Sequence, residues 1–143
     1  MALNAKHAPK GGKEFPPMEA GSYPARVVQV IDLGVQPQEY KGETKTPRQM
    51  ISMSYEFVDE FLPDENDEPD ETKPRWLSEQ FPINHLSSTL AKSTERYYAL
   101  DPNEEYDGDF TQLINIPCNV TVVQNKGTDG KIRNKIAGVS AMR

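Results

Sequence analysis

The arrangement of strand-like segments along the chain restricts its fold more than any other feature of the sequence. In residues 50–58, apolar side chains alternate with polar ones, which is the pattern of a strand with one buried face. The apolar positions of this segment are Ile51, Met53, Tyr55 and Phe57. Four further segments are rich in β-branched and apolar residues, as strands are: 21–33, 75–83, 118–124 and 131–139. Five strands within 143 residues predict a single β-rich domain.

One segment between the third and fourth of these strands, residues 87–100, has the pattern of a helix. Its predicted packing face recurs at helical spacing and consists of Leu90, Thr94, Tyr97 and Tyr98. We expect Ser87 or Ser88 to cap the helix, because a serine hydroxyl can accept a hydrogen bond from an unpaired backbone N–H. Asp101 and Pro102 are expected to end it.

Three connections between the strands have distinct compositions. Residues 34–49 hold two prolines and two glycines and are expected to form a long loop. Residues 59–73 are expected to form a mobile acidic loop, because the central part includes Pro69 and no large apolar residue. The last connection contains Asp129 and Gly130, a pair that suits the positive backbone angles of a hairpin turn.

The element order β-β-β-α-β-β predicts an all-β domain with one helix, arranged as an OB-fold-like five-stranded Greek-key barrel. Barrels of this type bind oligonucleotides on the face of strands two and three. The loops that join strands one and two and strands four and five contribute to the same site. We expect this single domain to span residues 21–140. Residues 1–20 are expected to form a flexible basic arm that carries Lys6, Lys10 and Lys13.

The distribution of charge matters more than the net charge of −6. Nine acids and no Lys or Arg lie between Glu56 and Glu71. Without these nine acids, the chain has 13 acids against 16 bases. The low isoelectric point therefore does not exclude a nucleic-acid partner.

Cationic and aromatic residues occur at the positions where such a barrel binds nucleic acid. The loop between strands one and two carries Tyr40, Lys41, Lys45 and Arg48. The last connection and the start of strand five carry Lys126, Lys131, Arg133 and Lys135. If Ile132 and Ile136 fill the barrel, alternation directs Arg133 and Lys135 outward. These cations would bind phosphates, with an affinity that falls as salt rises. Solubilising charge is the alternative interpretation of each basic loop.

Trp76 is the candidate for base stacking. Alternation places it with Ser78 and Gln80 on one face of strand three, opposite Leu77 and Phe81. An aromatic ring on a polar outer face can stack on an unpaired base, which contributes about 1–3 kcal/mol per base. The alternative is that this single tryptophan belongs to the core.

The sequence offers no pattern of a catalytic or metal site. His7 and His85 are too few and too far apart for a zinc site, and Cys118 begins an apolar strand, so we expect a buried, inert thiol. The run D-E-N-D-E-P-D-E lacks the glycine and the spacing of a calcium loop. No apolar run approaches the length of about 18 residues that a membrane helix needs. We therefore expect no enzyme, no cofactor, no metal and no membrane partner.

Six segments together carry a family resemblance across residues 20–140, and their specificity lies in their length and order. They are A-G-S-Y-P-A-R-V-V-Q-V-I-D-L-G-V-Q-P, S-Y-E-F-V-D-E-F, K-P-R-W-L-S-E-Q-F-P, A-K-S-T-E-R-Y-Y-A-L-D-P, G-D-F-T-Q-L-I-N-I-P-C-N-V-T-V and I-A-G-V-S. They resemble a phage-encoded family of small single-stranded DNA-binding proteins from replication modules. The resemblance implies an OB-type barrel that coats single strands during phage replication, recombination or repair.

The same resemblance implies a location and partners. It implies the cytoplasm of the infected bacterial host, with replication or recombination proteins as partners. The sequence does not specify an oligomeric state and leaves a homo-oligomer open. The resemblance assigns no residue role. Many single-stranded DNA-binding proteins end in an acidic tail that recruits partners, whereas this chain ends in A-M-R. Either the mid-chain acids serve a comparable role, or such a tail is missing from this chain.

Two other functions stay open at this stage. One is an acidic protein-interaction module, such as an inhibitor that mimics DNA with its carboxylates. The clustering of nine acids in one segment weighs against it, because a mimic should spread its charge over a surface. The other is a phage structural protein. The acidic segment also suggests a further hypothesis, in which it covers the basic face until single-stranded DNA displaces it.

Overall fold

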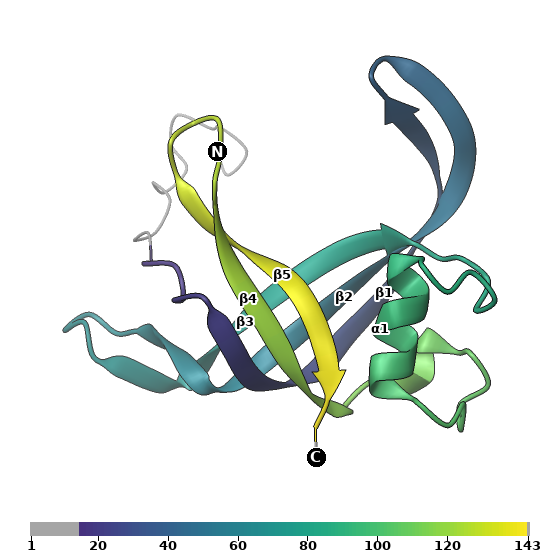
Figure 1. Ribbon diagram of the computed structural model, residues 1–143. Coiled ribbons are helices and arrows are strands. Elements are labelled where there is room, and N and C mark those ends of the chain that lie inside the picture. The colour runs from purple at the N-terminus through teal and green to yellow at the C-terminus, as the bar shows by residue number, and fades with distance from the viewer. Residues whose placement is uncertain (1–14, 143) are drawn as a thin grey trace, which may run out of the picture.

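The computed structural model describes residues 15–142, which form a mostly-β protein with one open antiparallel sheet and one short helix (Figure 1). The strands are β1 (Gly21–Tyr40), β2 (Glu43–Pro63), β3 (Pro69–Pro82), β4 (Pro117–Lys126) and β5 (Ile132–Ala141). Helix α1 (Lys92–Leu100) and the 3₁₀ helix η1 (Phe110–Leu113) lie between β3 and β4. This order confirms the predicted sequence of five strands with one helix after the third.

The long first strand connects the two halves of the sheet. Its residues 21–26 pair with β4, and most of its length from Ala25 to Tyr40 pairs with β2. The strand order is therefore β3-β2-β1-β4-β5, with β3 and β5 at the two edges. Cα atoms of β3 and β5 approach within 8 Å of one another, although no ladder joins the two strands.

The core lies on the inner face of this curved sheet. Ile51, Met53, Tyr55 and Phe57 are all buried there, as the alternation in β2 predicts. Tyr97 and Leu100 of α1 are also buried, and the helix packs against β3, β4 and β5 (Figure 1). The lone Cys118 is buried in the same core, as expected.

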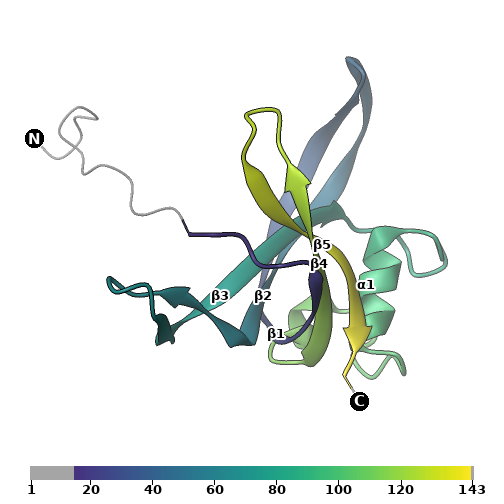
Figure 2. The same cartoon turned by 60° about the vertical axis from the view of Figure 1, so that its left-hand side comes forward.

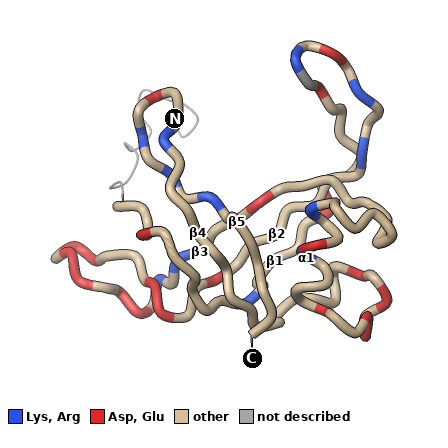
Figure 3. The backbone as a smooth tube through the Cα atoms, viewed as in Figure 1, with Lys and Arg blue, Asp and Glu red and all other residues tan. Residues whose placement is uncertain are grey.

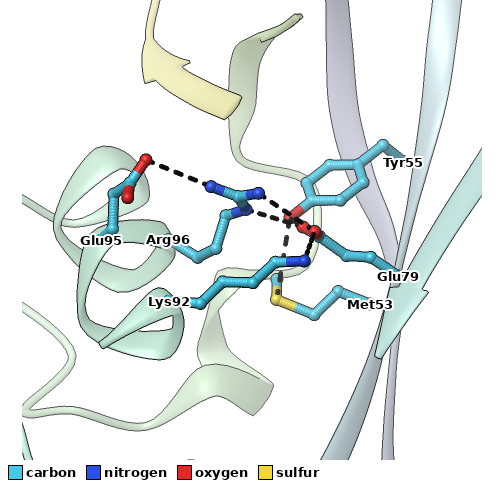
Figure 4. A network of polar contacts seen from close by, with 6 residues as sticks. All are labelled: Met53, Tyr55, Glu79, Lys92, Glu95 and Arg96. Carbon is cyan, nitrogen blue, oxygen red and sulfur yellow. Dashed lines mark hydrogen bonds and ion pairs between the residues drawn. The ribbon is translucent and has the colours of Figure 1, made fainter. Parts of the chain in front are cut away.

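A buried polar network joins α1 to the sheet (Figure 4). The Glu79 carboxylate accepts hydrogen bonds from Nε and Nη2 of Arg96 at 2.9 and 3.2 Å. It also accepts from the Tyr55 hydroxyl at 2.9 Å and pairs with Nζ of Lys92 at 3.0 Å. Burial alone would raise the pKa of Glu79, but the hydrogen bonds and charge of Arg96 outweigh it and hold this pKa below its ordinary value.

Residues 34–49 form a two-stranded ribbon, so the prediction of a long loop there is wrong. The strands turn at Lys41 and Gly42, whose φ angles of 51° and 79° are both positive, as in a two-residue hairpin turn. The ribbon projects beyond the rest of the sheet (Figure 1). Its prolines are tolerated there because each strand has a neighbour on one side only. The register also shifts beside Pro37, between Gln36 and Gln38.

The acidic segment is likewise a hairpin for most of its length. The loop itself is short, because β2 continues to Pro63 and β3 begins at Pro69. The Asp64 carboxylate accepts hydrogen bonds from the backbone N–H groups of Asn66 and Glu68 at 2.8 and 3.0 Å. An aspartate that bonds the backbone in this way stabilises a turn. The prediction treated these acids only as solvated charge and therefore made the loop too long.

The helix begins five residues later than predicted, at Lys92. Neither Ser87 nor Ser88 caps it; the cap position is Ala91, which makes no side-chain cap. The Ser87 hydroxyl instead contacts Nδ1 of His85 at 2.8 Å, and this local turn competes with helix formation. Leu90 consequently lies outside the helix with its side chain fully exposed, contrary to the predicted packing face.

The rest of the predicted helix agrees with the structure. Thr94 and Tyr97 are buried, and Tyr98 is partly buried. The helix ends at Leu100, where the N–H of Asp101 donates to the carbonyl of Tyr97 at 2.8 Å.

The segment before β1 is held between β3 and β5. Met18 is 4% exposed, and its N–H donates to Oδ1 of Asn134 at 2.8 Å. Its carbonyl accepts from Nδ2 of Asn134 at 2.9 Å and Nε2 of Gln124 at 2.8 Å. Arg75 of β3 donates to the carbonyl of Pro16 at 2.8 Å. The end of the predicted flexible arm is therefore anchored to the sheet, whereas Lys6, His7, Lys10 and Lys13 lie outside the described residues.

Candidate nucleic-acid interface

Strands β1, β2 and β3 together present a polar outer face, opposite the core. Cross-strand pairing aligns its side chains in three rows: Arg26–Glu56–Trp76, Gln29–Ser54–Ser78 and Ile31–Ser52–Gln80. We call these nine residues the outer face. Trp76, Ser78 and Gln80 are exposed, whereas Phe81 is buried and Leu77 packs partly against the core. The alternation predicted for the third strand is confirmed.

Trp76 is held at one end of this face and is half exposed to solvent. The residue is 51% exposed, so the alternative that it belongs to the core is wrong. Its indole Nε1 donates to Oε2 of Glu56 at 2.9 Å. The other oxygen, Oε1, accepts from Nε and Nη2 of Arg26 at 3.3 and 3.0 Å. Because these contacts already restrict the indole, stacking a base on it costs little further side-chain entropy.

The two remaining rows of the outer face are uncharged. The hydroxyls of Ser54 and Ser78 lie 2.6 Å apart, and the Ser54 hydroxyl donates to Oε1 of Gln29 at 3.2 Å. Ile31 adds a partly exposed apolar side chain. Ser52 and Ser54 are buried, so the exposed part of these rows consists of Gln29, Ile31, Ser78 and Gln80, which offer no charge to a phosphate.

The β1–β2 ribbon carries the first group of predicted cations. Lys41 lies in the turn, and the exposed Lys45 pairs with Glu43 at 3.3 Å. Arg48 is half-buried in β2 opposite Gln36 and forms no ion pair with any residue in the range 15–142. Tyr40 ends β1, but its side chain lies outside what the structure describes.

The β4–β5 hairpin carries the second group, in which all four cations are exposed: Lys126, Lys131, Arg133 and Lys135. Arg133 pairs with Asp129 at 2.6 Å, and its hydrogen bonds lower the pKa of Asp129 to about 2. Lys126 and Lys135 form no ion pair within the described part of the chain.

The packing prediction for this hairpin is confirmed at one isoleucine and wrong at the other. Ile136 is buried, whereas Ile132 is 50% exposed. Ile132 pairs with Lys126 next to the turn, at the projecting end of the hairpin, where core residues do not reach it.

The basic and acidic hairpins point in different directions. In Figures 1 and 2, the β1–β2 ribbon and the β4–β5 hairpin project from the same side of the sheet, and the β2–β3 hairpin projects from another. Figure 3 shows Lys and Arg concentrated on the first two and Asp and Glu on the third. In this structure the acidic hairpin does not cover the basic ones. The hypothesis that it does so before DNA binds stays a prediction about another state.

Among residues 15–142, no group of three or more His, Cys, Asp or Glu side chains could hold a metal ion. Burial raises the pKa of the Cys118 thiol to about 12, and an uncharged thiol is a poor nucleophile. No helix in the same range is long and apolar enough to cross a membrane.

Sequence reasoning missed Arg26 and Glu56, which complete the row that holds Trp76. Glu56 alternates with the core residues of β2, so its outward direction was predictable from the sequence. Its position beside Trp76 depends on the pairing register of three strands, which no local pattern specifies.

Comparisons with known proteins give no match to a protein family, to a curated protein or to a solved structure.

Proposed function

We propose that this chain is a sequence-independent single-stranded DNA-binding protein. The observation that carries the proposal is an exposed, hydrogen-bonded Trp76 on a face with no net charge, together with two basic hairpins that project from one side of the sheet. An aromatic ring for bases and cations for phosphates are the two components that binding of unpaired strands requires.

We further propose that the curved sheet is an OB-type barrel that is not fully hydrogen-bonded. The strand order and the approach of β3 to β5 support this assignment. The helix between β3 and β4, which packs on the inner side, also supports it. In such barrels, the connections β1–β2 and β4–β5 flank the ligand. Both are basic here.

In the proposed mechanism, the hairpins capture the strand and the outer face receives its bases. Lys126 and Lys135, which have no ion pair among residues 15–142, release counterions when they bind phosphates. The Trp76 indole stacks on a base and contributes about 1–3 kcal/mol. Neither interaction depends on base identity, because every base has a π face and every nucleotide has a phosphate. The binding is therefore independent of sequence.

The family resemblance supports a role in phage DNA replication, recombination or repair. In that role, the protein acts in the cytoplasm of the infected host beside replication or recombination proteins. A homo-oligomer that coats the strand is compatible with the same role.

A charge-reversal pair tests the binding surface. Lys135→Glu should weaken binding to oligothymidine about tenfold or more and reduce the log–log salt slope by about 0.7 per lost contact. The matched control, Lys73→Glu, makes the same change on the acidic hairpin, where Lys73 is exposed. It should change the affinity less than threefold. Equal losses for the two variants in a fluorescence anisotropy titration would contradict the proposed surface.

A deletion separates this proposal from the acidic interaction module. Removal of residues 64–71 should leave oligothymidine affinity unchanged or higher, because a competing polyanion is lost. If the full chain binds no oligonucleotide at low salt, the proposed function is wrong.

A further inference from the structure

The row Arg26–Glu56–Trp76 contains all of the charge on the outer face. The other two rows consist of serine, glutamine and isoleucine. We infer that this row is a binding site for one unpaired nucleobase. Glu56 makes this site selective for single strands over duplexes, because it holds Trp76 and occupies Arg26. This inference rests on the proposed function and deepens it.

The contacts of Glu56 explain why a base fits this row better than a phosphate. Arg26 directs Nε and Nη2 at the Glu56 carboxylate and Nη1 at Oδ1 of Asn115, 3.3 Å away. Three of the five N–H groups of the guanidinium therefore already have acceptors. The guanidinium charge is balanced by the adjacent carboxylate, so the row gives an approaching phosphate no net attraction.

The indole gives the row its attraction for bases. The only polar atom of the indole, Nε1, donates its hydrogen bond to Glu56, so the exposed part of the ring offers a π surface. An unpaired base can place its own face on that surface. In a duplex, base faces are covered by neighbouring pairs, and the exterior presents phosphates. A duplex can therefore use the basic hairpins but gains nothing from this row.

Removing the Glu56 charge should convert the row into a phosphate site. In Glu56→Gln, the amide oxygen can still accept from the Trp76 indole, so the ring keeps its support. The amide cannot balance Arg26, whose guanidinium becomes available to any phosphate. Duplex binding should then rise more than single-strand binding, because single strands already use the ring.

The experiment compares Glu56→Gln with Glu43→Gln. Glu43 is an exposed glutamate that also pairs with a cation, Lys45, so the control removes the same charge from the basic ribbon. Affinities for oligothymidine and for a duplex of equal length are measured by fluorescence anisotropy at several salt concentrations. In Glu56→Gln, duplex affinity should rise about tenfold, with a salt slope steeper by about 0.9. The ratio of single-strand to duplex affinity should fall about fivefold. In Glu43→Gln, both affinities should rise alike and the ratio should not change.

A second variant tests this nucleobase-binding site independently of any effect on folding. Trp76→Leu changes an exposed side chain and should weaken oligothymidine binding about tenfold or more while leaving duplex binding unchanged. Equal losses for both ligands would overturn the inference, and so would an unchanged ratio in a folded Glu56→Gln. In either case, single-strand binding by the wild type would still support the proposed function. A wild type that binds no single strand would refute the proposed function itself.

Discussion

The buried carboxylate of Glu79 supports a quantitative prediction of stability. In Glu79→Leu, the guanidinium of Arg96, which is 3% exposed, keeps only its 3.3 Å contact with Glu95. The hydroxyl of Tyr55 also loses its carboxylate partner. Removing one member of a buried ion pair costs about 3–5 kcal/mol, because the remaining charge stays desolvated. We expect a loss of this size in the free energy of unfolding.

The assay is urea unfolding followed by circular dichroism, together with a thermal scan. For a domain of this size, 1 kcal/mol shifts Tm by about 2–4 °C, so the variant should melt roughly 6–20 °C below the wild type. The slope of the unfolding free energy against urea should not change, because both proteins expose similar surface on unfolding.

Two further variants isolate the cause of this loss. Lys92→Met removes a partner of the same carboxylate, but the Lys92 side chain is 40% exposed, so the loss should stay below about 1 kcal/mol. The double variant Glu79→Leu with Arg96→Met removes both buried charges and should recover more than half of the stability. A loss below about 1 kcal/mol for Glu79→Leu would refute the reasoning, as would a double variant as unstable as the sum of its parts.

Three further predictions concern other parts of the molecule. Because the pKa of Glu79 is held below its ordinary value of 4.5, its contribution to stability is present above that pH and is lost as the pH falls through the folded-state pKa. The free energy of unfolding of Glu79→Gln, measured by urea titration, should therefore fall less between about pH 6 and pH 3 than that of the wild type. An acid dependence equal to that of the wild type would contradict this. Asn134→Ala removes both side-chain hydrogen bonds to the Met18 backbone and should cost about 1–3 kcal/mol in thermal unfolding; no loss would show that the anchor is unimportant. The Cys118 thiol, with its pKa raised to about 12 by burial, should react with iodoacetamide only in denaturant, and fast labelling of the native protein would contradict its position in the core.

Local periodicity predicted the parts of the structure that depend on a single strand. Alternation in residues 50–58 identified four buried side chains of β2, and alternation in β3 placed Trp76 on the outer face. Both succeed because successive side chains of a strand point to opposite sides whatever its partners are.

The features that the sequence did not predict depend on partners distant in the chain or on competing local hydrogen bonds. The prolines and glycines in residues 34–49 are typical of a loop, although an edge position in a ribbon also tolerates them. Asp64 and His85 form turns with nearby backbone and side-chain groups. As a result, the acidic loop is shorter and the helix begins later than the sequence predicts. The row of Arg26, Glu56 and Trp76 requires the register of three strands, and hydrophobic patterning does not specify it.

The emission of Trp76 during titration with oligothymidine is the most direct test of the central claim. The chain contains one tryptophan, so the signal reports only this ring. The account predicts quenching that saturates with oligonucleotide, with an affinity whose log–log salt slope is about −0.7 per phosphate contact. An unchanged emission spectrum, combined with no mobility shift at low salt, would contradict it.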